Sequence, residues 1–231
     1  MRRSRRFWAL AATASCAALA SASFAPGSPA GGAGAAPATA KRPQIRADHV
    51  DYGDRRRRQM AAYSKRHYGE REWRLGHPKV IVLHFTASDS YSAVWSTFDS
   101  NAPNMGELPG VCSHYVIEQD GTIDELVPPR TRCRHAIGLN HVAIGIEMVQ
   151  ETGRGAHWAD QQILDRGPQI RAALALVRWL QGRHAIPTGE VIGHAMANDD
   201  PHFEDREGWT NDHTDWLKRD VREFRERLKR R

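Results

Sequence analysis

Three short apolar runs, each leading to a polar side chain, constrain the fold of this chain more than any other sequence feature. The runs and the residues that follow them are Val80–Leu83 before His84, Val142–Ile146 before Glu147, and Val191–Ile192 before Gly193 and His194. Short runs rich in β-branched and aliphatic residues are typical of strands that are buried on both faces of a sheet. We therefore predict a sheet that contains these three strands.

Helical and hairpin patterns lie around these runs. Apolar residues recur at helical spacing in three segments, 55–68, 163–184 and 217–228. The strand-like stretches 113–118 and 122–127 are joined by a short turn that contains Gly121, which predicts a β-hairpin. Because strands and helices interleave, the predicted fold class is α/β, a single domain with a central mixed β-sheet flanked by helices.

The three polar residues at the strand ends, His84, Glu147 and His194, indicate a binding site. Ligands of open α/β sheets bind outside the carboxyl ends of the strands. One histidine in such a place is more often a hydrogen-bonded structural residue, but three polar residues together with a later segment that contains His213 and Asp215 favour a metal site. Two imidazoles and one carboxylate hold Zn²⁺ and leave a fourth position open, as in hydrolytic zinc sites.

The N-terminus has the three-part pattern of a secretory signal peptide. Four arginines precede a soft apolar stretch, and Ala20-Ser21-Ala22 is a cleavage site of the A-x-A kind. The alternative, an uncleaved membrane anchor, is disfavoured because the stretch is rich in Ala and Ser. We predict a signal peptide over 1–22, a flexible Ala/Gly/Pro linker over 23–42, and a catalytic domain over 43–231 of an exported protein without stable membrane insertion.

Charge and cysteine content narrow the partners and the compartment. The net charge of +6 falls to about +2 once the four signal arginines are removed, so nucleic acid is not an expected partner. The basic run 55–58 is expected to be a solvated helix face. Cys112 and Cys133 are the two cysteines left after Cys16 is removed, and an even pair in an exported protein predicts a disulfide.

Four ordered segments between residues 78 and 218 make the chain resemble the type 2 N-acetylmuramoyl-L-alanine amidases, a family related to phage amidases and peptidoglycan recognition proteins. The segments are Val82-Leu83-His84-Phe85-Thr86-Ala87, His114-Tyr115-Val116-Ile117-Glu118-Gln119-Asp120-Gly121, His135-Ala136-Ile137-Gly138 followed by Asn140 through Glu147, and Ile192-Gly193-His194. The resemblance implies zinc-dependent hydrolysis of the amide bond between N-acetylmuramic acid and L-alanine in peptidoglycan. A non-catalytic peptidoglycan-binding module on the same fold is the main alternative.

The resemblance also implies roles for single residues. His84 and His194 are expected to be zinc ligands, and Glu147 the general base that moves the proton. Some relatives have a tyrosine before the hairpin histidine, and Ser113 stands there in this chain, which leaves the proton transfer to Glu147. His114 and His135 are expected to be structural residues or part of the substrate groove. Trp209 and Trp216 are expected either to stack on sugar rings or to belong to the core.

The third zinc ligand has two alternatives. The usual spacing after the second histidine points to His202 or Glu204. The segment His213-Thr214-Asp215 instead resembles the family's K-T-D segment, which requires an insertion of about eleven residues between the second and third ligands. Such an insertion costs little, because the entropic cost of closing a loop grows only slowly with its length. We predict Asp215 as the ligand and His213 as the group that steadies the oxyanion, and we keep His202 as the alternative ligand.

Overall fold

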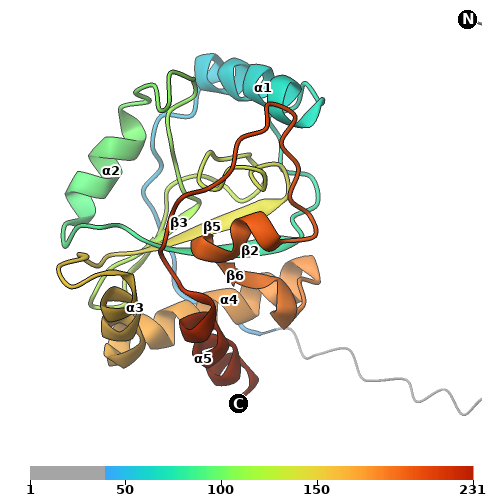
Figure 1. Ribbon diagram of the computed structural model, residues 1–231. Coiled ribbons are helices and arrows are strands. Elements are labelled where there is room, and N and C mark those ends of the chain that lie inside the picture. The colour runs from blue at the N-terminus through green and yellow to red at the C-terminus, as the bar shows by residue number, and fades with distance from the viewer. Residues whose placement is uncertain (1–39, 231) are drawn as a thin grey trace, which may run out of the picture. The chain divides into compact units, whose positions relative to one another are not determined.

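The three apolar runs form adjacent parallel strands at one side of a six-stranded mixed sheet in the computed structural model, which describes residues 40–230 (Figure 1). The strand order is β1-β4-β3-β5-β2-β6, and β3 and β4 form an antiparallel pair. The strands are β1 (Arg46–Ala47), β2 (Val80–Phe85), β3 (Tyr115–Ile117), β4 (Ile123–Glu125), β5 (Ala143–Met148) and β6 (Val191–Gly193). The predicted α/β class with a mixed sheet is confirmed.

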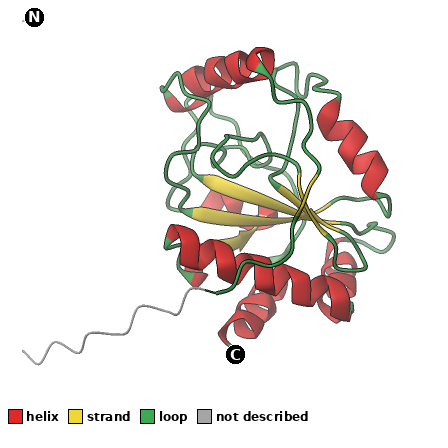
Figure 2. Ribbon diagram, turned by 180° about the vertical axis from the view of Figure 1, so that it is seen from behind, coloured by secondary structure: helices red, strands yellow, loops and turns green. Residues whose placement is uncertain are grey.

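Helices lie on both sides of this sheet. They are α1 (Asp54–Tyr68), α2 (Tyr91–Asp99), α3 (Ala156–Asp165), α4 (Gly167–His184) and α5 (Lys218–Lys229), with short 3₁₀ helices at Thr188–Glu190 and His194–Asp199. Figure 2 shows α3, α4 and α5 together on one side, and α1 and α2 on the other. Within residues 40–230, no helix combines the length and the apolar character that crossing a membrane requires.

Alternation along β2 determines which side of the sheet carries the chemistry. Ile81 and Leu83 belong to the main core that the sheet forms with α3, α4 and α5. Val80 and Val82 belong to a smaller cluster on the opposite face. Because successive side chains of a strand point to opposite faces, His84 lies on the same face as Val80 and Val82, away from α4.

Several predicted elements differ in detail from the observed ones. The strands β2 and β5 continue one residue beyond His84 and Glu147, so both residues are the penultimate residues of their strands. The segment 163–184 is not one helix, because the chain leaves helical geometry at Arg166 between α3 and α4. Helix α2 was not predicted.

The basic run 55–58 is only partly the solvated face that was expected. Arg55 and Arg58 are exposed, but Arg56 is buried. Its guanidinium donates to the carbonyl oxygens of Phe98 and Val111, at 2.7 and 3.0 Å. The correction follows from helix geometry, because four consecutive residues cover all sides of a helix and one of them must face the protein.

Candidate metal centre

The sheet register brings the three predicted strand-end residues into one row. His84 of β2 pairs with Glu147 of β5, and Leu83 pairs with Gly193 at the end of β6. His194 therefore follows β6 at the level of His84 on the other side. Since β5, β2 and β6 are parallel neighbours, the row lies at the carboxyl ends of three adjacent strands.

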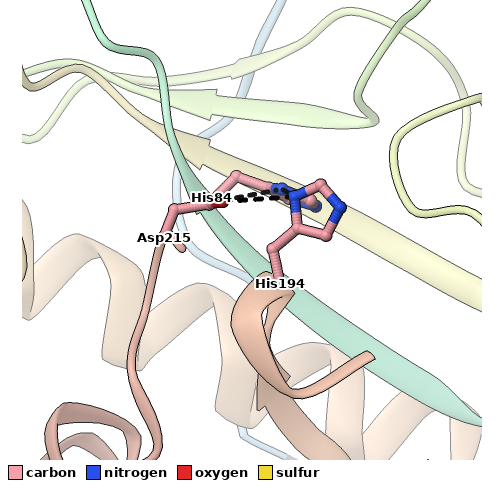
Figure 3. Close-up of side chains that lie close together, drawn as sticks. All are labelled: His84, His194 and Asp215. Carbon is pink, nitrogen blue, oxygen red and sulfur yellow. Dashed lines mark hydrogen bonds and ion pairs between the residues drawn. The ribbon is translucent and has the colours of Figure 1, made fainter. Parts of the chain in front are cut away.

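Two of these residues meet Asp215 in a compact triangle (Figure 3). The Nδ1 atoms of His84 and His194 are 3.1 Å apart, and they lie 3.1 and 3.2 Å from the Oδ2 and Oδ1 atoms of Asp215, respectively. All three residues are buried. Asp215 arrives from the chain just before α5, 131 residues after His84. The fold thus assembles a possible metal site from distant parts of the sequence.

The hydrogen bond on the far side of the His194 ring determines which nitrogen carries the proton. Its Nε2 atom lies 2.9 Å from Oδ1 of Asn211. An amide oxygen only accepts, so Nε2–H is the donor, and in the neutral ring Nδ1 carries the lone pair. The amide orientation of Asn211 is itself defined, because Oδ1 accepts from the Ile137 N–H at 3.0 Å and Nδ2 donates to the Ile137 carbonyl at 2.8 Å.

A second chain of hydrogen bonds gives the same result for His84. Nε2 of His135 lies 3.3 Å from the Ala143 carbonyl, which only accepts, so His135 is protonated on Nε2. The Nδ1 atom of His135 is therefore an acceptor, and it receives the Nε2–H of His84 at 3.1 Å. Burial, with the nearby His194, lowers the pKa of His84 to about 4, which keeps its ring neutral. The Nδ1 atom of His84 therefore also carries a lone pair.

This donor set fits a zinc ion. With both rings neutral and protonated on Nε2, two nitrogen lone pairs and a carboxylate oxygen converge, an arrangement that is repulsive until a cation joins it. Nitrogen and oxygen ligands about 2.0–2.1 Å from a tetrahedral zinc ion lie about 3.3 Å from one another. The separations of 3.1–3.2 Å among His84, His194 and Asp215 are close to that value.

Glu147 stands beside the triangle in a desolvated position. Its Oε2 atom is buried without a hydrogen-bond partner. Burial, with the nearby Asp215 carboxylate, raises the pKa of Glu147 to about 8. A carboxyl group whose pKa lies near neutrality can both accept and donate a proton under ordinary conditions.

His213 is the exposed neighbour of the triangle. Its ring stacks on that of His194, with centroids 4.1 Å apart and an angle of 16° between the planes. Its Nδ1 atom lies 3.7 Å from Oδ1 of Asp215, and the side chain is 59% exposed. His213 is therefore close enough to reach a molecule bound at the site.

These residues line one cavity of about 1270 Å³. Its wall includes the triangle, Glu147 and His213, and it extends past Thr97 and Met105. Met105 is 61% exposed. A cavity of this size accommodates a ligand larger than a single sugar or amino acid.

The remaining sequence candidates fall into structural places. His114 is buried, donates from Nε2 to the Thr131 carbonyl at 2.8 Å and accepts the Gly145 N–H on Nδ1 at 2.9 Å, so both nitrogens are used. Trp216 belongs to the core, and Trp209 packs edge-on against His67. Neither tryptophan is part of the cavity wall.

The alternative third ligand lies elsewhere. The Nε2 atom of His202 is 4.0 Å from Oε2 of Glu190, and the backbone N–H of Glu204 donates to the Gly138 carbonyl. Neither residue belongs to the triangle, which Asp215 completes. The structure also contains the predicted disulfide between Cys112 and Cys133, whose Cα atoms are 5.4 Å apart.

Two contacts that hold the Asp215 segment were missed at the sequence level. The indole N–H of Trp216 donates to the His84 carbonyl at 3.2 Å, and the Asp160 carboxylate accepts the backbone N–H groups of Trp216 and Leu217 at 3.0 and 2.9 Å. Trp216 also adopts a positive φ of 57°, which is unusual for a residue other than glycine. No local sequence pattern signals these long-range contacts.

Comparison with known proteins shows which family the chain belongs to. Residues 74–212 match the N-acetylmuramoyl-L-alanine amidase family. The chain belongs to this family. A search of curated proteins found no match. The matched residues include His84, His194 and Glu147. They end before Asp215, whose place beside the two histidines is known from the structure alone.

Solved structures that are similar to this chain include the amidases LysCS and AmiD. The endolysin amidase LysCS from Clostridium intestinale is 22% identical, with a TM-score of 0.44 over 67% of this chain and 83% of its own. The amidase AmiD from E. coli, in complex with a muropeptide substrate, is 25% identical, with a TM-score of 0.41 over 55% of this chain and 54% of its own. The assignment to the amidase family rests on the sequence match.

Proposed function

We propose that the protein is a zinc-dependent N-acetylmuramoyl-L-alanine amidase, which hydrolyses the amide bond between N-acetylmuramic acid and the L-alanine of the stem peptide. Family membership supports the amidase activity on peptidoglycan. The observation that carries the zinc dependence is the convergence of three potential metal-ligand atoms, from His84, His194 and Asp215, in the wall of a large cavity.

In this proposal His84 and His194 bind zinc through Nδ1, and Asp215 binds it through a carboxylate oxygen. Zinc supplies a Lewis acid that polarises the scissile carbonyl and makes water more acidic. The outer hydrogen bond from His84 to His135 keeps that imidazole in the tautomer that a metal requires.

Glu147 carries the proton through the reaction. It takes a proton from the attacking water as the new C–O bond forms at the lactyl carbonyl. It then gives a proton to the L-alanine nitrogen as the C–N bond breaks, so the stem peptide leaves with a free amino group. Its position on β5, directly across from His84, and its raised pKa support this role.

His213 is proposed to stabilise the charge that develops on the carbonyl oxygen. A ring N–H from either protonation state can donate to an oxyanion. Its stacking on His194 and its exposure to the cavity support this role. One face of the His213 ring is thus packed on His194, and its edge is available to the substrate.

The test is a digest of purified sacculi with the protein that begins after Ala22. The expected products are glycan strands without stem peptides and new L-alanine amino groups, identified by amine labelling and mass spectrometry. A matched sample with Glu147→Gln controls for contaminating hydrolases. Tight binding to sacculi without release of amino groups would identify the non-catalytic wall-binding module instead.

We also propose that the protein is exported, with a signal peptide over 1–22 and a linker over 23–42. Residues 1–39 lie outside the part of the chain that the structure describes. The proposal is supported by the signal-like sequence and by the Cys112–Cys133 disulfide, because such bonds persist in oxidising compartments. N-terminal sequencing of the protein recovered outside the cytoplasm should begin at Ser23, and a start at Met1 would contradict cleavage.

A further inference from the structure

The segment between the second and third proposed ligands is folded against the domain at several points. The backbone N–H of Glu204 donates to the Gly138 carbonyl at 3.0 Å, and that of Arg206 donates to the His67 carbonyl at 2.9 Å. The Asp205 carboxylate contacts Nδ1 of the fully buried His67 at 2.7 Å. The loop over 198–211 is thus an ordered part of the domain.

This loop ends at Asn211, whose side chain is held on every polar atom. Its Oδ1 accepts from the Ile137 N–H and its Nδ2 donates to the Ile137 carbonyl, at 3.0 and 2.8 Å. Asn198 adds contacts to Nδ2 and to both backbone polar groups of Asn211, at 2.8–3.1 Å. A flip of the amide would place like groups against Ile137, so the oxygen is kept toward His194.

We infer that Asn211 is a positioning residue for the metal centre, and that the loop over 198–211 supplies the outer hydrogen-bond partner of His194. This inference rests on the proposed function, because it assigns the contact to zinc binding. The Asn211 oxygen accepts the Nε2–H of His194 at 2.9 Å and thereby leaves Nδ1 free to coordinate.

The physical effect of this contact is on the tautomer and on the ring orientation. Without an acceptor at Nε2, His194 is free to carry its proton on Nδ1, where Asp215 at 3.2 Å would accept it. That tautomer cannot bind a metal through Nδ1. Loss of an outer partner typically lowers metal affinity about 10- to 100-fold.

Two substitutions separate positioning of His194 from attachment of the loop. Asn211→Leu removes the acceptor and the donor together. Asn211→Asp keeps an acceptor for His194 but loses the donor to the Ile137 carbonyl and to Asn198. If Asn211 positions His194, only the leucine variant should lose affinity, and if it merely fastens the loop, both variants should lose it equally.

The experiment measures the zinc dissociation constant of the full mature protein by competition with a chromophoric chelator. We expect about 10- to 100-fold weaker binding for Asn211→Leu and a value within about threefold of the wild type for Asn211→Asp. His202→Ala, in the same loop but outside the triangle, is the control and should bind like the wild type. Thermal unfolding of each metal-free variant shows whether the domain is intact.

The outcomes distinguish this inference from the proposed function. Equal losses in both Asn211 variants, or no loss in Asn211→Leu, would overturn the positioning role while the wild type still binds zinc. A wild type that binds no zinc would overturn the proposed zinc dependence, and the inference with it. A metal-free Asn211→Leu that unfolds at a much lower temperature than Asn211→Asp would show that the asparagine acts on the fold rather than on His194.

Discussion

A single methyl group at Gly193 should disrupt the metal centre. Gly193 adjoins the proposed ligand His194, and Trp216 adjoins the proposed ligand Asp215. A Cβ atom built on Gly193 would lie 1.8 Å from the Trp216 carbonyl oxygen and 2.6 Å from its Cβ. The positions of the added Cβ atom and of the Trp216 atoms that it meets are fixed by the backbone, so no side-chain rotation relieves the clash.

The size of the effect follows from these distances. Non-bonded carbon and oxygen atoms do not approach within about 3 Å, so Gly193→Ala must move the two segments apart by more than about 1 Å. Zinc–ligand distances tolerate only about 0.2 Å. His194 and Asp215, on opposite sides of the clash, could not both bind one ion, so turnover should fall by at least about 100-fold. Overpacking should also cost about 1–3 kcal/mol of unfolding free energy.

The assay combines zinc content by mass spectrometry, amino-group release from sacculi and urea unfolding of the metal-free protein. Gly189→Ala is the matched control, because a Cβ atom added at Gly189 would meet no atom within 4 Å and the residue precedes the same strand. The control should change stability by less than about 0.5 kcal/mol. Full zinc content and activity in Gly193→Ala would refute the packing of Trp216 on this strand and the assignment of Asp215 as a ligand.

Three further predictions follow from other residues. Glu147→Gln should lower turnover about 10²- to 10⁴-fold with zinc retained, and a smaller loss would assign the proton transfer to another group. Removal of the disulfide by Cys112→Ala and Cys133→Ala should lower the unfolding free energy by about 3 kcal/mol, as expected for a closed loop of 21 residues, and unchanged urea unfolding would contradict it. Burial lowers the pKa of His114 to about 4, so its contribution to stability is present above the unfolded value of about 6.5 and is lost as the pH falls toward about 4. Between pH 7 and pH 5 the wild type should therefore lose up to about 2 kcal/mol more than His114→Gln, and equal losses would contradict a neutral buried His114.

The parts of the fold that were predictable are those with local signals. Runs of β-branched residues marked β2, β5 and β6, and the polar residues at their ends marked the site. Gly121, which adopts a positive φ of 92°, marked the hairpin turn between β3 and β4. These signals depend on neighbours along the chain, so the sequence alone carries them.

The parts that were not predictable depend on contacts between distant segments. Helix α2 is an exception, because it carries two local signals that the prediction overlooked: the Ser90 cap, and apolar residues at helical spacing that pack in one cluster, Tyr91, Val94, Trp95 and Phe98. Asn211 and His135 act through hydrogen bonds to residues that only the fold brings near. The choice between His202 and Asp215 likewise required the path of the loop over 198–211, since spacing along the chain favoured the residue that lies away from the site.

The most direct test of the proposed zinc centre is a titration of metal-free protein with Zn²⁺ during digestion of sacculi. The proposal predicts no release of L-alanine amino groups without metal, and a rise that reaches its plateau at about one equivalent of zinc per chain. Asp215→Ala should show no rise at the same zinc concentrations. Full activity in protein shown to contain no metal would contradict the proposal.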